Sequence, residues 1–409
     1  AGFHGGIGIA YANSTQTARA ICLVDALLGC IGHKGGALNP PSPLPLGDLD
    51  PARFPAPPVP AVLKLGAERY PLVDPVRGLC TAIGQSILEG DLKALFVYAS
   101  NPGAGYGNAG EWLRILGRLD LLVTIDIRMS ETALASDYIL PDVTYLEADR
   151  GVGLPVGRND SRIYYRGAVL PVQHPDTRPG WRIFTGLARA CGYGRYFDFT
   201  PGDLAAAQVA PFGIDLCDLR ARGWADTGAG PAPRTGEPVI TVPGGKIELA
   251  SGLWERAGLG RVPDWIPPMV EPAPGMFRLI SGNRPFESHT SRALAARGAA
   301  EEGADLGSVQ MNADVAARMG IEDGEVVALV SDMGRDRVRV ETTPYLHPAC
   351  IFTSAAPGGR SGARAAARDG STELGVGPLD HTPLRWDPIT GAALTQENAV
   401  RVEKLEGSA

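Results

Sequence analysis

The sequence lacks any long hydrophobic segment. A transmembrane helix requires about 18 or more consecutive apolar residues, and no such run occurs, so no membrane span is expected. Positive charge is also scarce, because the formal net charge is −7 and the sequence pI is about 5.5. Nucleic-acid-binding domains usually carry a basic face, so nucleic acid is not expected among the partners.

Cysteine is sparse, and no two cysteines stand at Cys-x-x-Cys spacing. An iron–sulfur cluster or a zinc site built by this chain alone is therefore not expected. The motifs of zinc peptidases and of serine-hydrolase elbows are also absent, and the segment 244–246 (GGK) does not have the spacing of a phosphate loop. The six cysteines are Cys22, Cys30, Cys80, Cys191, Cys217 and Cys350.

The sequence begins with AGFHGGIGIA, without an initiator methionine or a signal peptide. This start predicts a fragment of a larger protein. Hydrophobic residues make up 44% and charged residues 20%, which allows two or three globular domains.

Changes in composition divide the chain into four segments. Residues 1–86 contain a glycine-rich turn, a helix and a proline-rich excursion over 39–75, where regular structure is not expected. Residues 87–200 form the first predicted domain, and 276–409 form the last. Residues 201–275 between them are rich in Pro, Gly and Asp, which predicts an irregular connecting segment.

The segment 87–200 alternates short apolar strands with amphipathic helices. This alternation predicts an α/β domain with a parallel sheet that binds a nucleotide. Expected strands cover 93–100, 121–126 and 138–141, and expected helices cover 14–28, 111–119, 130–138 (capped by Ser130) and 181–192. The segment 276–409 predicts a closed β-barrel, with strands at 277–282, 325–331, 337–343 and 350–355 and one helix at 312–320.

Polar side chains follow the first two predicted strands of the α/β domain. Ser100 and Asn101 precede a glycine-rich turn, Gly105-x-Gly107-x-x-Gly110, and Asp126 ends the next strand. Such glycines allow a backbone to approach a pyrophosphate, and such an acid can accept hydrogen bonds from a ribose or a base. In a chain with 53 glycines, an ordinary surface turn is an equal explanation.

The residues after Asp126 have a simpler interpretation. One interpretation makes Thr132 and Asp137 solvated or capping groups of a short helix, and it is favoured for Asp137. A third cluster of donors follows the first barrel strand, in SGNRPFESHTSR (281–292). This cluster favours an anion or heterocycle site, and its members are Arg284, His289, Thr290, Ser291 and Arg292.

Together these segments resemble the molybdopterin oxidoreductase family of the dimethyl sulfoxide reductase type. The resemblance rests on GFHGGIG, ALFVYASNP, TIDIRMSETALASDYILPDVTYLEADRG and TVPGGKIELAS, and on the closing DPITGAALTQENAVRV, in the family's order. It implies an oxidoreductase with bis(molybdopterin guanine dinucleotide) and molybdenum, and a double-psi β-barrel as the C-terminal domain.

The resemblance also implies the cofactor-binding residues. Ser100, Asn101, Ile125 and Asp126 would contact a guanine nucleotide. Arg284, Ser288, His289, Thr290 and Ser291 match the family's pterin loop, and Gln396 and Asn398 match positions that reach the dinucleotides. Gly5 stands where relatives often have Gln.

This chain has no counterpart of the family's N-terminal 4Fe-4S domain or of its molybdenum ligand, so no catalytic or metal-ligating residue is assigned. NSTQTARAI and QENAVRV are most similar to thiosulfate, polysulfide and tetrathionate reductase subunits of anaerobic respiration. That likeness implies a small anionic substrate, an iron–sulfur electron-transfer subunit, a quinone-linked membrane subunit, and a periplasmic or membrane-associated location. Formate dehydrogenase, nitrate or arsenate reductase types, a nicotinamide dehydrogenase using GYGNAG, and a scaffold without cofactor are the alternatives.

Overall fold

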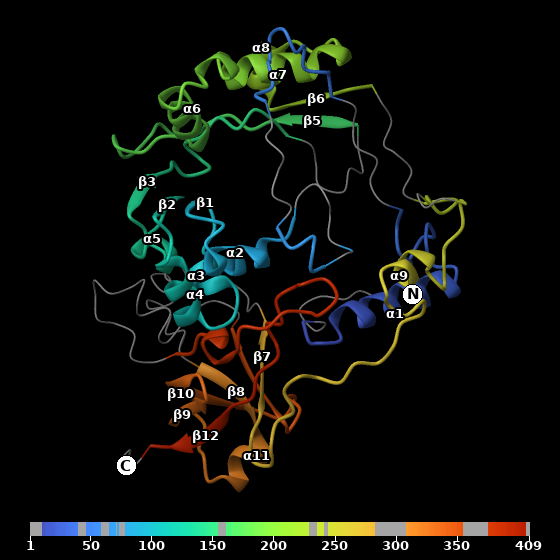
Figure 1. The fold of residues 1–409 in the computed structure, drawn as a ribbon, viewed down its shortest axis with the longest axis vertical. Coiled ribbons are helices and arrows are strands. Elements are labelled where there is room, and N and C mark those ends of the chain that lie inside the picture. The colour runs from blue at the N-terminus through green and yellow to red at the C-terminus, as the bar shows by residue number, and fades with distance from the viewer. Residues whose placement is uncertain are drawn as a thin grey trace.

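The computed structural model describes ten stretches of the chain: residues 10–39, 46–58, 65–70, 72, 78–153, 161–228, 235–240, 244–282, 308–354 and 375–405. In Figure 1 the C-terminal sheet (orange to red) lies at the bottom, and a three-stranded sheet (cyan to teal) lies above it on the left. Green helices form an arch at the top, and the N-terminal helix (blue) lies on the right.

The N-terminal helix α1 (Ser14–Leu27) confirms the predicted helix over 14–28. The carboxylate of the buried Asp387 accepts hydrogen bonds from the hydroxyl (2.9 Å) and the backbone N–H (3.4 Å) of Thr15 in its first turn. On its outer side Arg19 lies 3.6 Å over the ring of Trp254, in the short helix α9 (Gly252–Arg256). These contacts join α1 to segments more than 200 residues away in the sequence.

The predicted parallel sheet is confirmed, with the order β1 (Ala94–Tyr98), β2 (Leu121–Asp126), β3 (Tyr138–Pro141). One of its faces packs on the amphipathic helix α4 through Val97, Trp112 and Leu122. The neighbouring helices are η2 (Cys80–Ala82), α2 (Ile83–Glu89), α3 (Pro102–Gly105), α4 (Ala109–Leu116) and α5 (Glu131–Leu134).

Residues 201–275 were predicted to be irregular, and this prediction is wrong for 201–226, which contain helices and a strand. Thr200 and Asp203 form a capping box on α7, and Asp215 caps α8, because proline and acids in a first turn start a helix rather than break it. The domain boundaries remain a prediction. The elements here are α6 (Gly180–Ala190), η3 (Gly194–Tyr196), α7 (Pro201–Val209), η4 (Ala210–Phe212) and α8 (Leu216–Arg222), with the antiparallel strands β4 (Val152–Gly153), β5 (Arg162–Tyr165) and β6 (Trp224–Asp226).

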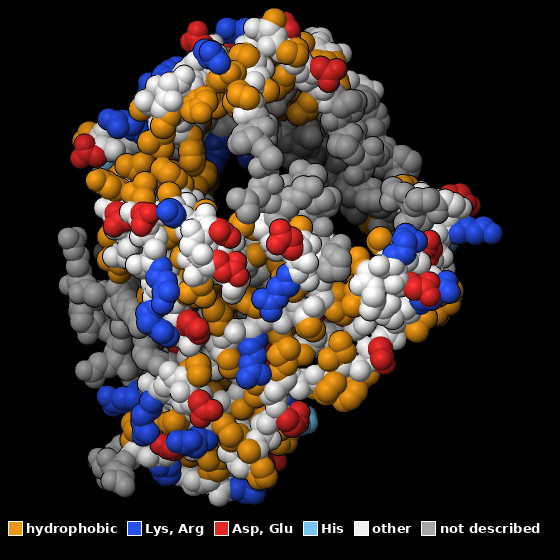
Figure 2. Space-filling view, viewed as in Figure 1, with side chains coloured by type: hydrophobic (Ala, Val, Ile, Leu, Met, Phe, Trp, Pro, Cys, Tyr) orange, Lys and Arg blue, Asp and Glu red, His pale blue; other side chains and the backbone are white. Residues whose placement is uncertain are grey.

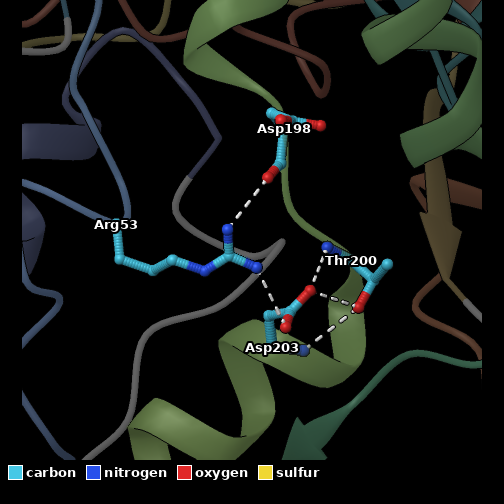
Figure 3. Close-up of polar contacts among 4 residues, drawn as sticks. All are labelled: Arg53, Asp198, Thr200 and Asp203. Carbon is cyan, nitrogen blue, oxygen red and sulfur yellow. Dashed lines mark hydrogen bonds and ion pairs between the residues drawn. The ribbon is translucent and has the colours of Figure 1, made fainter.

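The proline-rich segment is joined to this arch by Arg53. Its guanidinium lies 3.1 Å from a carboxylate oxygen of Asp203 and donates to the backbone carbonyl of Asp198 (Figure 3). The same carboxylate accepts hydrogen bonds from the N–H and the hydroxyl of Thr200, both at 2.7 Å. Asp203 therefore completes the cap of α7 and also fixes the proline-rich segment, whose described residues form no helix or strand.

The C-terminal strands form a six-stranded mixed sheet in the order β12-β9-β10-β8-β11-β7. Its core consists of fully buried side chains such as Leu279, Met311, Leu329 and Ile351. The elements are β7 (Arg278–Gly282), β8 (Ser308–Asn312), α11 (Ala313–Arg318), β9 (Val326–Ser331), β10 (Gly334–Thr343), β11 (Cys350–Ser354), η5 (Pro378–His381) and β12 (Arg401–Lys404).

The sequence predicted a closed barrel here, but the described residues form an open sheet whose two edge strands, β7 and β12, approach each other. Phe277 and Val400, which precede β7 and β12, form one antiparallel bridge with hydrogen bonds of 2.7 and 2.8 Å. A barrel requires a continuous ladder between its first and last strands. Among the described residues the two edge strands share this bridge and no ladder.

Acidic and basic side chains are interspersed over the face in Figure 2, and hydrophobic side chains gather at its upper left, over β3 and α6. Tyr138, Trp181 and Phe184 of these elements are 64%, 39% and 39% exposed. None of the helices in the described part of the chain is long and apolar enough to cross a membrane.

Candidate functional site at the carboxyl ends of the parallel strands

The three parallel strands end at one edge of their sheet, and the predicted nucleotide-contacting residues meet there. The backbone N–H of Ala99 donates to the carbonyl of Ile125, and that of Asp142 donates to the carbonyl of Asp126. The loop after β1, with Ser100 and Asn101, therefore lies directly beside the loop after β2. Ligands of open α/β sheets bind at this edge. The nucleotide contacts themselves remain a prediction.

Asn101 is held between the two loops by its side-chain amide. Its Nδ2 donates to the carboxylate of Glu131 at 2.6 Å, and its Oδ1 accepts from the backbone N–H and the hydroxyl of Thr132, at 3.2 and 2.8 Å. The Thr132 hydroxyl also accepts from the N–H of Gly103 at 2.9 Å. Ser100 beside it is exposed and free to contact a ligand.

Glu131 and Thr132 are the residues that sequence reasoning missed. A solvated or capping role was one interpretation of Thr132, but Thr132 is completely buried, and Glu131 is only 4% exposed. Ser130 caps their helix α5 as predicted, but α5 is a single turn that ends at Leu134, shorter than the predicted helix over 130–138. Two adjacent buried polar residues produce no periodic pattern in a sequence. The signal that could have pointed to them is the Asn-Pro loop 30 residues earlier, whose Asn101 needs hydrogen-bond partners.

Asp126 ends β2 with a half-buried side chain. Partial burial raises the pKa of its carboxyl group, opposed by hydrogen bonds from the backbone N–H groups of Ile127 and Arg128. Its Oδ1 accepts from Ile127 at 2.6 Å. The Ile125 side chain points into the core and is fully buried, so Ile125 shapes the edge through its backbone.

The Gly105-x-Gly107-x-x-Gly110 turn has a packing role. A Cβ atom on the buried Gly107 would lie 3.1 Å from the carbonyl oxygens of Thr382 and Pro383. The N–H of Asn108 donates to Leu379 at 2.7 Å, and the Asn108 side chain caps α4. The C-terminal segment thus covers this turn, which favours packing over phosphate binding.

Asp137 has a structural role, but it bonds to a neighbouring strand and does not cap the short helix as its sequence context indicated. Its carboxylate accepts from the N–H of Leu122 at 2.7 Å, and its own N–H donates to the Leu122 carbonyl. These bonds lie near the amino end of β2, away from Asp126. Asp137 therefore helps to align β3 with β2.

Gln396 and Asn398 are buried at the C-terminal sheet. Gln396 donates to the hydroxyl of Ser281 at 3.0 Å, and Asn398 accepts from the N–H of Leu279 at 3.0 Å. Both therefore hold β7 just before the predicted pterin loop, and their contact with a dinucleotide remains a prediction. Arg284, Ser288, His289, Thr290, Ser291 and Gly5 lie outside the described residues.

Glu397, between these two residues, was not singled out from the sequence. Its fully buried carboxylate accepts hydrogen bonds from the backbone N–H groups of Ala12, Met269 and Val270, at 2.7, 3.1 and 2.9 Å. It joins the N-terminal segment, the connection before β7 and the C-terminal segment. As for metals, the described stretches contain no group of three or more His, Cys, Asp or Glu side chains that could hold one.

Two family profiles match the chain. Residues 9–190 match "Molybdopterin oxidoreductase", and residues 277–393 match "Molydopterin dinucleotide binding domain". The predicted site residues from Ser100 to Asp126 lie within the first match and those of the loop 284–291 within the second, whereas Gln396 and Asn398 lie just beyond it.

Individual relatives agree with this match at low identity. The thiosulfate reductase molybdopterin-containing subunit of Salmonella typhimurium is 25% identical over 92% of this chain and 54% of its own length. The assimilatory nitrate reductase catalytic subunit of Bacillus subtilis is 28% identical over 66% of this chain and 38% of its own length. The solved structure of acetylene hydratase from Pelobacter acetylenicus shares the fold, with a TM-score of 0.70 and 19% identity over 96% of this chain and 59% of that one. The chain spans about half the length of the relatives it matches.

Proposed function

The chain belongs to the molybdopterin oxidoreductase family, and on that premise we propose that it is the dinucleotide-binding part of a molybdenum-dependent oxidoreductase that holds bis(molybdopterin guanine dinucleotide). The observation that carries the proposal is the meeting of the Asn101 and Asp126 loops at one sheet edge. That edge offers the amide of Asn101, the exposed hydroxyl of Ser100 and the half-buried carboxylate of Asp126 on two adjacent loops.

These groups fit a guanine nucleotide. A half-buried carboxylate can accept from the N1–H and the 2-amino group of guanine, which are both donors. Ser100, Asn101 and the backbone of Ile125 would contact the same nucleotide. Arg284, Ser288, His289, Thr290, Ser291, Gln396 and Asn398 would form the second part of the site. When bound, the cofactor would supply two-electron or atom-transfer chemistry at molybdenum.

For the substrate we propose a sulfur oxyanion or polysulfide, of the thiosulfate, polysulfide or tetrathionate type. Support comes from the relative whose match covers 92% of this chain, a thiosulfate reductase subunit. Nitrate and formate types are the alternatives, since relatives named for them match as well. The name of the first relative also supports assembly with further subunits. With this function we propose a 4Fe-4S cluster, an iron–sulfur partner, a quinone-linked membrane subunit and a periplasmic or membrane-associated location. We also propose that the C-terminal sheet closes as a double-psi barrel.

The test is recovery of the cofactor from protein made in cells that synthesise it. The purified chain should release a pterin that becomes fluorescent on oxidation, together with guanine nucleotide and molybdenum. Asp126→Ala should reduce the recovered cofactor, because a lost charge-assisted contact costs about 1.5–3 kcal/mol. Asp120→Ala removes an exposed acid just before the same strand and should leave recovery unchanged. Retained NADH without pterin would contradict the proposal.

A further inference from the structure

Asn101 is bound on three sides by groups whose chemistry dictates the orientation of its amide. A backbone N–H can only donate, so Thr132 requires the Asn101 oxygen. The carboxylate of Glu131 accepts, so it requires the nitrogen. The amide therefore has one orientation, with Oδ1 toward Thr132 and Nδ2 toward Glu131.

This arrangement uses almost all of the hydrogen-bonding capacity of Asn101. An amide oxygen has two lone pairs, and both are taken by the N–H and the hydroxyl of Thr132. An amide nitrogen has two hydrogens, and one is directed to Glu131. What remains for a ligand is a single N–H donor.

We infer that Glu131 and Thr132 are positioning residues that make Asn101 a donor-only contact for the nucleotide. The inference rests on the proposed function and deepens it. Asn101 then recognises an acceptor, such as a phosphate oxygen or the O6 or N7 atom of guanine, and not the N1–H or 2-amino group. Those donors are left to the carboxylate of Asp126, on the neighbouring loop.

The two roles differ in their response to the guanine 2-amino group. Calorimetric titration with GDP and with inosine diphosphate, which lacks that group, separates them. Glu131→Ala, which removes the acceptor for the Asn101 amide nitrogen, and Thr132→Val should each weaken binding of both nucleotides by the same factor, roughly 3-fold to 10-fold for one net hydrogen bond. Asp126→Asn should weaken GDP more than inosine diphosphate. Thr132→Ser keeps the hydroxyl and should restore binding lost in Thr132→Val.

A double-mutant cycle separates positioning from general damage. In an Asn101→Ala background, Glu131→Ala should cause no further loss of nucleotide binding, because the inference assigns its effect on binding to Asn101. Losses that add, or a change in GDP relative to inosine diphosphate in Glu131→Ala, would overturn the inference and leave the proposed function intact. If Glu131→Ala does not fold, the Thr132→Val and Thr132→Ser pair gives the same comparison. Failure of the unaltered chain to bind either nucleotide would overturn both.

Discussion

At the residue scale, Asp126 combines a structural cost with a proposed binding role. Burial raises the pKa of its carboxyl group. A raised pKa in the folded state means that the charged form is less favourable there than in the unfolded chain. Its contribution to stability is therefore fully present below the unfolded pKa and is lost as the pH rises through the folded value. Functional sites often retain such costs.

Asp126→Asn should accordingly raise the melting temperature at pH 7 while it weakens binding of GDP. Asparagine keeps an oxygen that can accept from the N–H of Ile127, so the turn is preserved. The gain in stability should shrink as the pH falls, and it should vanish below about pH 4, where the free carboxyl group is protonated. Thermal unfolding of both proteins from about pH 3 to about pH 8 checks this prediction. A gain independent of pH would refute the role of the charge.

Removing Glu397 should lower the stability of the fold, whereas Asp126→Asn should raise it. Its fully buried carboxylate is bonded to three backbone N–H groups from two distant segments. Glu397→Ala leaves these donors unpaired, so the free energy of unfolding should fall by about 3 kcal/mol or more. Urea unfolding measures the loss, and Glu403→Ala, at a more exposed acid of the same segment, serves as the control. Equal effects of the two substitutions would mean that the three bonds contribute little.

At the scale of elements, the sequence predicted strands and helices that depend on the pattern of neighbouring residues. β2 occupies the predicted residues 121–126, because a run of mainly apolar residues (LLVTI) fits a strand buried on both faces. The helices α7 and α8 were missed, because Pro, Gly and Asp were interpreted as signs of irregular structure when they are the caps of these helices. The burial of Glu131 and Thr132 depends on a loop 30 residues away in the sequence, which no window of local sequence contains.

The capping box of α7 makes a pH-dependent prediction. Hydrogen bonds from Thr200, with the ion pair to Arg53, lower the pKa of Asp203 to about 2. A lowered pKa stabilises the fold above the unfolded value and loses that effect as the pH falls through the folded one. Asp203→Asn should therefore lower the melting temperature at pH 7, with the difference disappearing between about pH 4 and pH 2.

The control for this prediction is Asp198→Asn. Asp198 contacts Arg53 through its backbone carbonyl, which the substitution preserves. It should therefore leave the pH dependence of melting unchanged. If Asp198→Asn and Asp203→Asn behave alike, the capping box is not the origin of the effect.

At the scale of the whole molecule, residues 378–391 connect the α/β layer to the C-terminal sheet. Leu379 accepts from Asn108, the carbonyl of Gly391 accepts from the hydroxyl of Thr81 at 2.6 Å, and the ring of Trp386 lies 6.5 Å from that of Trp112. The sequence predicted each half from its own pattern. It did not predict this junction, or the order of strands in the C-terminal sheet, because both depend on pairings between distant segments.

Gly107→Ala tests the junction. The added methyl group would lie 3.1 Å from two backbone carbonyl oxygens, at a position with φ +22°, so the free energy of unfolding should fall by about 1–3 kcal/mol. Gly105→Ala is the matched control, since no atom lies within 4 Å of its added methyl group. Urea unfolding compares them, and equal stability of the two variants would contradict the close packing.

The most direct test of the central claim is hydrogen–deuterium exchange of the chain with and without GDP. Binding at the carboxyl ends of the parallel strands should slow exchange in peptides that cover 99–103 and 126–132. Peptides from the arch, residues 161–228, should exchange at the same rate in both states. Slower exchange confined to the arch, or no change anywhere at saturating GDP, would contradict a guanine nucleotide site at this edge.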